Sequence, residues 1–203
     1  MPQIDFDGAN SLVKTDKIQG QGGTTVTVPT GHTVAITDAG GLTLAGTAVN
    51  AGALGKVVQV VNTTTGASAT GTTTMPHDDT IPQNSEGTEY MTLAITPTSS
   101  SNKLLIEWVA NIATSAPMQM TTALFQDSTS NALAVLLEYN SNTNAGVVMS
   151  GKHYMAAGTT SSTTFKLRCA SQNAATMTFN GYSGSRLYGG ALASSITITE
   201  IAV

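Results

Sequence analysis

The sequence predicts an all-β protein whose larger part is an antiparallel β-sandwich or barrel. Of its 203 residues, 34 are Thr and 18 are Ser, while only 5% are aromatic. Such a chain is rich in β-branched and turn-forming residues and poor in helix formers. Apolar and polar residues alternate through many short runs, and Ser, Thr, Asn and Gly fill the joins between them. This combination is typical of short antiparallel strands linked by polar turns.

Charge and cysteine content exclude several classes of function. Charged residues make up 10% of the chain and the eight Lys and Arg are scattered singly, so no electrostatic nucleic-acid site is expected. The single cysteine, Cys169, excludes an intrachain disulfide and the usual cysteine-based zinc sites. No apolar run approaches ~18 residues, so no membrane insertion is expected. The start, MPQIDFDGANS, lacks the regions of a signal peptide, which favours synthesis in a cytosol.

The first quarter of the chain has two parts. Residues 1–20 show little periodicity, which favours an irregular arm that a partner supports. Residues 21–54 alternate through TVTV, TVAI and LTL, with the turn signals PTGH and DAGG between them. Strands this short bury too little apolar area to be stable alone. Identical copies that wind together would cover each other's apolar faces, so this segment indicates self-association.

From residue 55 onward the strands lengthen and the turns between them remain short and polar. Their spacing favours a β-sandwich or barrel with antiparallel strands. The predicted strands are residues 56–62, 89–97, 103–114, 120–127, 133–140, 146–157, 163–171, 175–181 and 194–203.

Some of these strands are apolar on both faces. Leu104, Ile106 and Trp108 share one face of their strand, but Leu105 and Val109 occupy the other. The strand LAVLLEYN has the same character. A sandwich in which each sheet exposes one face to solvent should not show this pattern. Either the arm covers these strands or they lie in a subunit interface, and we favour the interface.

The segment GTTVTVPTGHTVAITDAGGL resembles β-rich shaft pieces of bacteriophage fibre and appendage proteins. Three further segments are similar to terminal domains of the same group of proteins. They are DDTIPQNSEGTEYMTLAITPTSSSNKLLIEW, HYMAAGTTSSTTFKLR and ASSITITEIAV. The resemblance implies a homotrimeric virion protein with a jelly-roll-like tip. Together with the patterns above, it gives a virion-docking arm (1–20), a short intertwined β shaft (21–54) and a C-terminal jelly-roll sandwich (55–203).

The stretch MPHDDTIPQNSEG places His77, Asp78 and Asp79 side by side. Imidazole and carboxylate groups suit Zn, Mn or Ca, so a metal site is one interpretation. However, consecutive residues of an extended chain point to alternating sides, so one metal centre rarely takes all three. Pro76 and Pro82 restrict the backbone on both sides, and Asp side chains there can accept from nearby amides. We interpret the stretch as a rigid lead-in to the next strand, and we expect no metal and no cofactor.

Three other residues have side chains that can react or bind a metal: Cys169, His153 and His32. Cys169 shares a strand face with Phe165 and Leu167, which predicts a small buried side chain. His153 lies on a strand and His32 follows a turn, so a core or interface position and a local hydrogen bond are expected. In a trimer, three copies of either histidine on the axis could trap an ion, which remains a hypothesis.

No catalytic motif is evident. The chain lacks G-x-S-x-G, H-E-x-x-H, a Walker loop and a G-x-G-x-x-G before a helix. GYSGS only superficially resembles a serine elbow, because β-like segments flank it. Glu107 and Glu138 could form a glycosidase-like pair, although bonds to Lys103, Lys152 or Arg168 are the preferred interpretation. We therefore do not expect an enzyme.

The best candidates for binding lie in the late loop NGYSGSRLYGG, which offers Tyr182, Arg186 and Tyr188. Aromatic faces stack on sugar rings, and arginine donates paired hydrogen bonds to carboxylate or phosphate groups. The plainer interpretation is that these side chains pack along the domain surface.

The predicted function is structural and adhesive. The chain is expected to be a trimeric phage tail fibre or appendage of the virion, assembled in the host cytoplasm. Its first 20 residues would dock on other virion proteins, and its tip would touch a host surface glycan or protein. Two alternatives remain open: a capsid head fibre or decoration protein with no dedicated receptor, and a spike that hydrolyses glycans.

Overall fold

The computed structural model describes residues 43–44, 47–48 and 57–203. The chain divides into two compact units, Met1–Asn50 and Ala51–Val203. In the first unit, β1 (Thr43–Leu44) and β2 (Thr47–Ala48) form an antiparallel pair. The predicted arm, most of the predicted shaft segment and His32 lie outside the described residues, so those expectations stay predictions.

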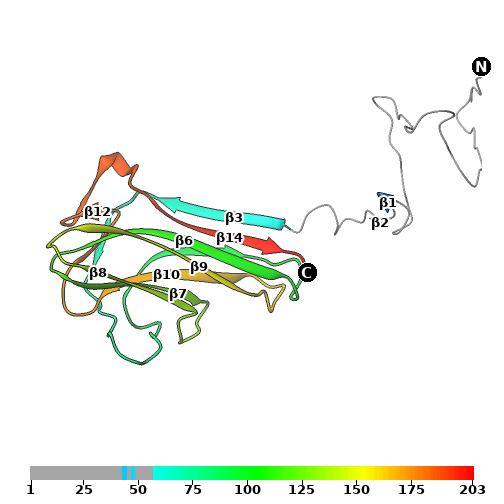
Figure 1. Cartoon of the computed structure of the whole chain (residues 1–203), viewed down its shortest axis with the longest axis horizontal. Coiled ribbons are helices and arrows are strands. Elements are labelled where there is room, and N and C mark those ends of the chain that lie inside the picture. The colour runs from blue at the N-terminus through cyan, green and yellow to red at the C-terminus, as the bar shows by residue number, and fades with distance from the viewer. Residues whose placement is uncertain (1–42, 45–46, 49–56) are drawn as a thin grey trace, which may run out of the picture. The chain divides into compact units, whose positions relative to one another are not determined.

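The second unit is built from two antiparallel sheets that pack as a sandwich, which confirms the predicted all-β fold (Figure 1). The four-stranded sheet has the order β5-β10-β7-β8, with bounds β5 Thr88–Ile95, β10 Thr163–Ser171, β7 Met118–Gln126 and β8 Ala134–Asn140. The six-stranded sheet has the order β3-β14-β6-β11-β4, and β9 also pairs with β6. Its bounds are β3 Val57–Thr65, β14 Ser194–Ile201, β6 Lys103–Thr114, β11 Met177–Phe179, β4 Ala69–Gly71 and β9 Gly146–Ala156.

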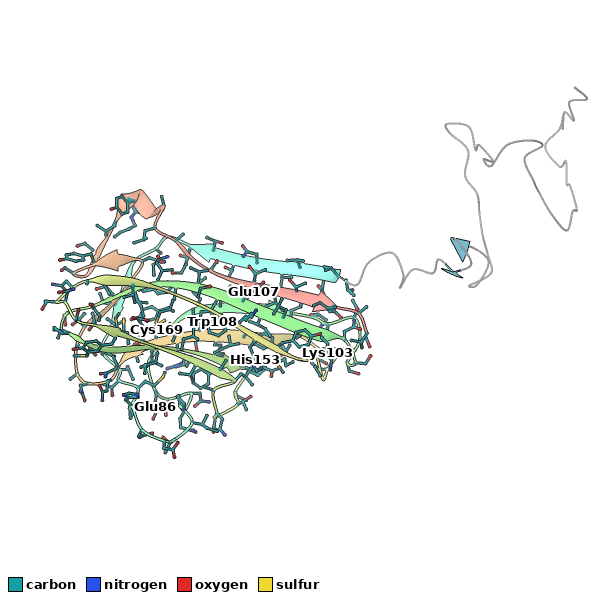
Figure 2. All side chains as sticks on the ribbon, in the orientation of Figure 1. Glu86, Lys103, Glu107, Trp108, His153 and Cys169 are labelled. Atoms are coloured by element: carbon teal, nitrogen blue, oxygen red, sulfur yellow. The ribbon has the colours of Figure 1, made fainter. Side chains whose placement is uncertain are left out.

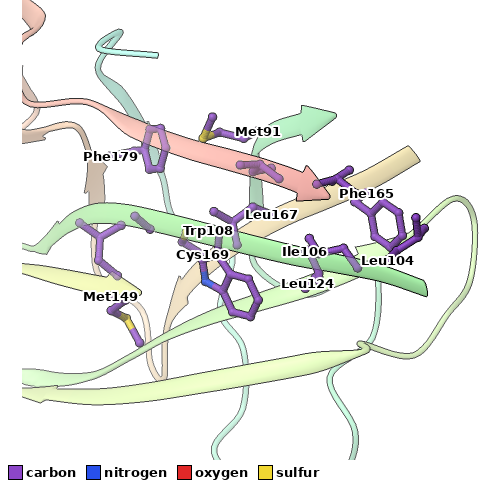
Figure 3. Packing of buried hydrophobic residues seen from close by; sticks show 14 of the residues in the cluster. Met91, Leu104, Ile106, Trp108, Leu124, Met149, Phe165, Leu167, Cys169 and Phe179 are labelled. Atoms are coloured by element: carbon purple, nitrogen blue, oxygen red, sulfur yellow. The ribbon is translucent and has the colours of Figure 1, made fainter. Parts of the chain in front are cut away.

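Alternation along the strands explains how the two sheets share one core. Phe165, Leu167 and Cys169 of β10 are each completely buried, as their common face predicted. Trp108 of β6 lies among them, and Figure 3 shows its ring between the strands of the two sheets. Gly151 of β9 must be glycine, because a Cβ there would collide with the Trp108 ring.

The two ends of the sandwich differ. At one end, here called the base, Val57 begins β3 and pairs with Ile201 near the C-terminus. At the other, the distal end, Thr65 ends β3 and pairs with Ser194. Figure 1 shows the base on the right and the distal end on the left, beside β12. Since residue 57 lies at the base, the preceding chain joins the sandwich there.

Candidate binding surface at the distal end

The three predicted binding residues lie in one short segment at the distal end. A two-stranded hairpin, β12 (Gly181–Tyr182) and β13 (Ser185–Arg186), follows β11. Ser183 and Gly184 form its turn with φ values of 49° and 79°, as a tight hairpin of the primed type requires. A 3₁₀ turn at Tyr188–Gly190 then leads back toward β14. The sequence pattern predicted a loop here, but not a hairpin.

All three side chains are open to solvent. Tyr182 is 46% exposed, Tyr188 is 79% exposed, and Arg186 belongs to the exposed class. Tyr188 has a φ of 50°, in the left-handed region that costs a bulky residue about 1–2 kcal/mol. The fold therefore holds a large aromatic side chain in solvent on strained backbone, which is a feature of binding and catalytic sites.

The backbone after Tyr188 is closely packed. Gly190 has a φ of 96°, and a Cβ added to it would lie 3.3 Å from Nη1 of Arg186. A Cβ on Gly66 would collide with the carbonyl oxygen of Gly190. This close approach fixes the loop against the end of β3, and it places the Arg186 guanidinium beside the tight turn.

A buried polar network anchors the root of the hairpin. The Asn180 side chain is completely buried, and its Nδ2 donates to the carbonyl oxygens of Thr65 (2.7 Å) and Ala67 (3.1 Å). Its Oδ1 accepts from Oγ of Ser194 at 2.6 Å, and that Oγ accepts from the backbone N–H of Asn111 at 2.9 Å. Asn180 also adopts a φ of 51°, which asparagine tolerates better than most residues. The network fixes the direction in which the hairpin leaves the sheet.

A polar hollow of about 310 Å³ adjoins the hairpin turn. Its lining side chains are neutral hydrogen-bonding groups, and the backbone N–H of Gly184 donates to Oγ1 of Thr178 at its edge. The lining residues are Ser115, Asn144, Thr176, Thr178, Ser183 and Gly184. All but Thr178, which lies on β11, come from four separate turns, and sequence reasoning did not show that these turns converge. Hydroxyl and amide groups beside exposed tyrosines can hydrogen-bond and stack on a polyhydroxylated ligand.

The stretch around His77, Asp78 and Asp79 has a structural role in this fold. Met75 is buried in a small cluster with Phe125 on the outside of the four-stranded sheet, and its N–H donates to the Ser171 carbonyl oxygen at 3.1 Å. Asp78 accepts from the N–H of Thr80 and from the Thr80 hydroxyl, and these bonds lower the pKa of Asp78.

In residues 57–203 no group of three or more His, Cys, Asp and Glu side chains is arranged to hold a metal. The Asp78 turn matches the interpretation of a rigid lead-in to β5. Arg168 adds to it by donating from Nε and Nη2 to the carbonyl oxygens of Glu86 (2.8 Å) and Gly87 (2.7 Å).

The remaining candidates occupy separate places. His153 is half-buried on the inner face of β9, and burial lowers its pKa. Burial also raises the pKa of Cys169, as expected for an inert core thiol. Glu107 and Glu138 are exposed on strands of different sheets, and Glu107 is opposite Lys152 in the strand register. Figure 2 shows Glu107, His153 and Cys169 on their strands.

No protein-family model and no curated protein matches the sequence. Solved structures with similar strand arrangements include the sugar-binding C-terminal domain of EclA, with 16% identity, a TM-score of 0.33, and coverage of 58% of this chain and 76% of that one. The TNF protein Eiger from S. frugiperda has 10% identity, a TM-score of 0.38, and coverage of 70% and 93%. The Gx strain of infectious bursal disease virus has 11% identity, a TM-score of 0.32, and coverage of 71% and 36%.

Since these TM-scores are all below 0.5, the fold assignment rests on the strand pairing of this chain itself. Within the described residues, no helix has the length and apolar character needed to traverse a bilayer.

Proposed function

We propose that this chain is a bacteriophage virion protein, a homotrimeric tail fibre or appendage that contributes to host attachment. The observation that carries the proposal is the display of Tyr182, Arg186 and Tyr188 at the distal end, opposite the end where the preceding chain joins. An adhesive tip needs this polarity, since the particle holds one end and the host surface meets the other. The role requires binding and no catalysis.

The chemistry of the distal end supports a surface glycan as the host ligand. Tyrosine rings can stack on sugar rings, and Arg186 can donate to the carboxylate or phosphate groups of bacterial surface polymers. The adjoining hollow presents hydroxyl and amide groups and no carboxylate. Three such weak sites on one trimer would gain from avidity without a deep pocket. In this proposal residues 1–20 dock on other virion proteins.

Host-cell adsorption tests the attachment role. The double variant Tyr182→Ala/Arg186→Ala is expected to lose adsorption while keeping the native mass of the wild type. Ile81→Ala is the control, because Ile81 is 54% exposed in a loop that contacts the turn between β7 and β8, at the opposite end of β7 from the hairpin. Unchanged adsorption of the double variant would reject the distal surface as the attachment site.

Light scattering tests the trimer separately. A native mass of about 62 kDa is expected, three times the 20.7 kDa of the chain. A mass of 20.7 kDa at micromolar concentration would reject the trimer.

A further inference from the structure

The surface of β3, β14, β6 and β9 that points away from the four-stranded sheet is here called the outer face. It is the face opposite Trp108 and the core. Its side chains are mostly apolar or hydroxyl-bearing. They are Val60, Asn62, Thr64, Ser195, Thr197, Thr199, Leu105, Glu107, Val109, Val148, Ser150, Lys152 and Tyr154, with Lys103 at the margin.

Strand register aligns an apolar row across this face. Val60 pairs with Thr199, Thr199 pairs with Leu105, and Leu105 pairs with Tyr154. Val60 is 55% exposed and Tyr154 is 56% exposed, although each lies beside a well-packed sheet. Exposed apolar side chains that gather on one face are typical of interaction surfaces.

The next row carries two opposite charges. Thr197 pairs with Glu107, and Glu107 pairs with Lys152, so the acid and the base face each other on adjacent strands. Neither charge has an ion-pair partner within 4.0 Å among residues 57–203. Both side chains border a hollow of about 520 Å³ over small residues of β9 and β14. A face that carries one acid and one base can pair each of them with the opposite charge of a second copy.

We propose that the outer face joins copies of this chain, with Glu107 of one copy paired to Lys152 of the next. The proposal rests on the homotrimer of the proposed function and adds which surface forms it. Cyclic trimers use heterologous contacts, in which a residue of one copy meets a different residue of its neighbour. A face that bears both signs of charge satisfies this rule without any other partner.

The dimensions of the outer face set the size of such a contact. Four strands at ~4.8 Å spacing and about seven residues at ~3.3 Å cover on the order of 450 Å² in projection. Because a cyclic trimer divides this face between two neighbours, each contact is in the size range of small interfaces, and three such contacts close the ring. The apolar row would supply the buried centre, with Tyr154 as its largest anchor, and the charged row would set the register.

Cysteine cross-linking tests the contact in the full chain. Chains carrying Glu107→Cys and chains carrying Lys152→Cys are co-expressed and then oxidised. Disulfide-linked pairs of about 41 kDa, twice the chain mass, are expected above the level of either variant expressed alone. The native Cys169 is completely buried and does not compete. Ile81→Cys replaces Lys152→Cys in the control, since Ile81 is 54% exposed in the loop before β5 and does not lie on the outer face.

The outcomes separate this inference from the proposed function. A native mass near 62 kDa with no linked pairs above the Ile81→Cys control would overturn the outer face as the interface and leave the trimer standing. A native mass of 20.7 kDa would overturn both.

Charge reversal gives a second readout that needs no cysteine. Glu107→Lys and Lys152→Glu should each raise the dissociation constant about 10-fold or more, and mixing the two variants should recover part of the loss. No recovery on mixing would count against the intersubunit pair.

Discussion

Replacement of Glu200 by glutamine should destabilise the protein in a way that depends on pH. Glu200 is completely buried at the base of the sandwich, where it has no cationic partner within 4.0 Å among residues 57–203. Its Oε1 accepts from the Thr98 N–H and hydroxyl, both at 2.8 Å, and from Nδ2 of Asn102 at 2.6 Å. Its Oε2 accepts from Nε2 of Gln59 at 2.6 Å. One carboxylate thus joins β3, β14 and the loop before β6.

The hydrogen bonds decide the charge state of this group. Burial alone would raise the pKa of Glu200, but the donors from Gln59, Asn102 and Thr98 outweigh it and lower the pKa from 4.5 to about 2. At 1.36 kcal/mol per pKa unit, ionisation contributes at most about 3 kcal/mol to the free energy of unfolding. Because the folded pKa is depressed, this contribution is complete above about pH 4.5 and is lost as the pH falls toward 2.

Urea unfolding followed by fluorescence of Trp108, the only tryptophan, measures this effect. Glu200→Gln should lower the free energy of unfolding by about 2–3 kcal/mol at pH 7, because its amide places a donor against the Gln59 donor. The gap to the wild type should shrink from pH 4.5 downward and nearly vanish at pH 2. Protein concentration is held fixed, since self-association shifts apparent stability.

Glu138→Gln is the matched control at an exposed site and should change stability by less than about 0.5 kcal/mol. A gap for Glu200→Gln that stays constant between pH 7 and pH 2 would refute the reasoning, since the loss would then not depend on the carboxylate.

Two further predictions concern the distal end. Asn180→Ala should lower the free energy of unfolding in urea by about 3–4 kcal/mol. The reason is that Thr65, Ala67 and Ser194 lose their hydrogen-bond partner and alanine disfavours a φ of 51°. A decrease below 1 kcal/mol would contradict the anchoring role. Tyr188→Gly should stabilise the fold by about 0.5 kcal/mol, because it relieves the strain of the left-handed backbone at this position. The same variant should adsorb less to host cells. A destabilised variant with normal adsorption would show that Tyr188 serves packing instead.

The strands of the sandwich could be predicted from the sequence because each depends on local pattern. Lys103–Thr114 and Thr163–Ser171 have the predicted bounds, since these runs rich in apolar residues border polar turns. The short strands β4, β12 and β13 were missed, because two or three residues carry no periodicity. Glu200 lies on the core face of β14, but its donors are 98 to 141 residues away in the chain, so no local pattern could show how its charge is satisfied.

The candidate site was predictable in composition and not in geometry. The mixture of Tyr, Arg and Gly in residues 180–190 indicated an exposed binding loop. Its location at the distal end depends on the strand order. The alternating pattern does not determine that order, because different sandwich topologies share the pattern. The neighbouring hollow is lined by four turns and by Thr178 of β11, and only the folded sheet order brings them together.

Strand β14 connects the two ends of the sandwich in a way that bears on attachment. Its first residue, Ser194, belongs to the Asn180 network at the hairpin root, and its seventh, Glu200, holds the hydrogen-bonded clamp at the base. Between them the strand pairs with β3 on one side and β6 on the other. A binding loop fixed in this way loses little conformational entropy on contact with a ligand. Each copy in a multivalent assembly would therefore bind at a lower entropic cost. In the proposed attachment role, the buried polar networks at the two ends would keep the distal residues in one orientation relative to the base of the sandwich.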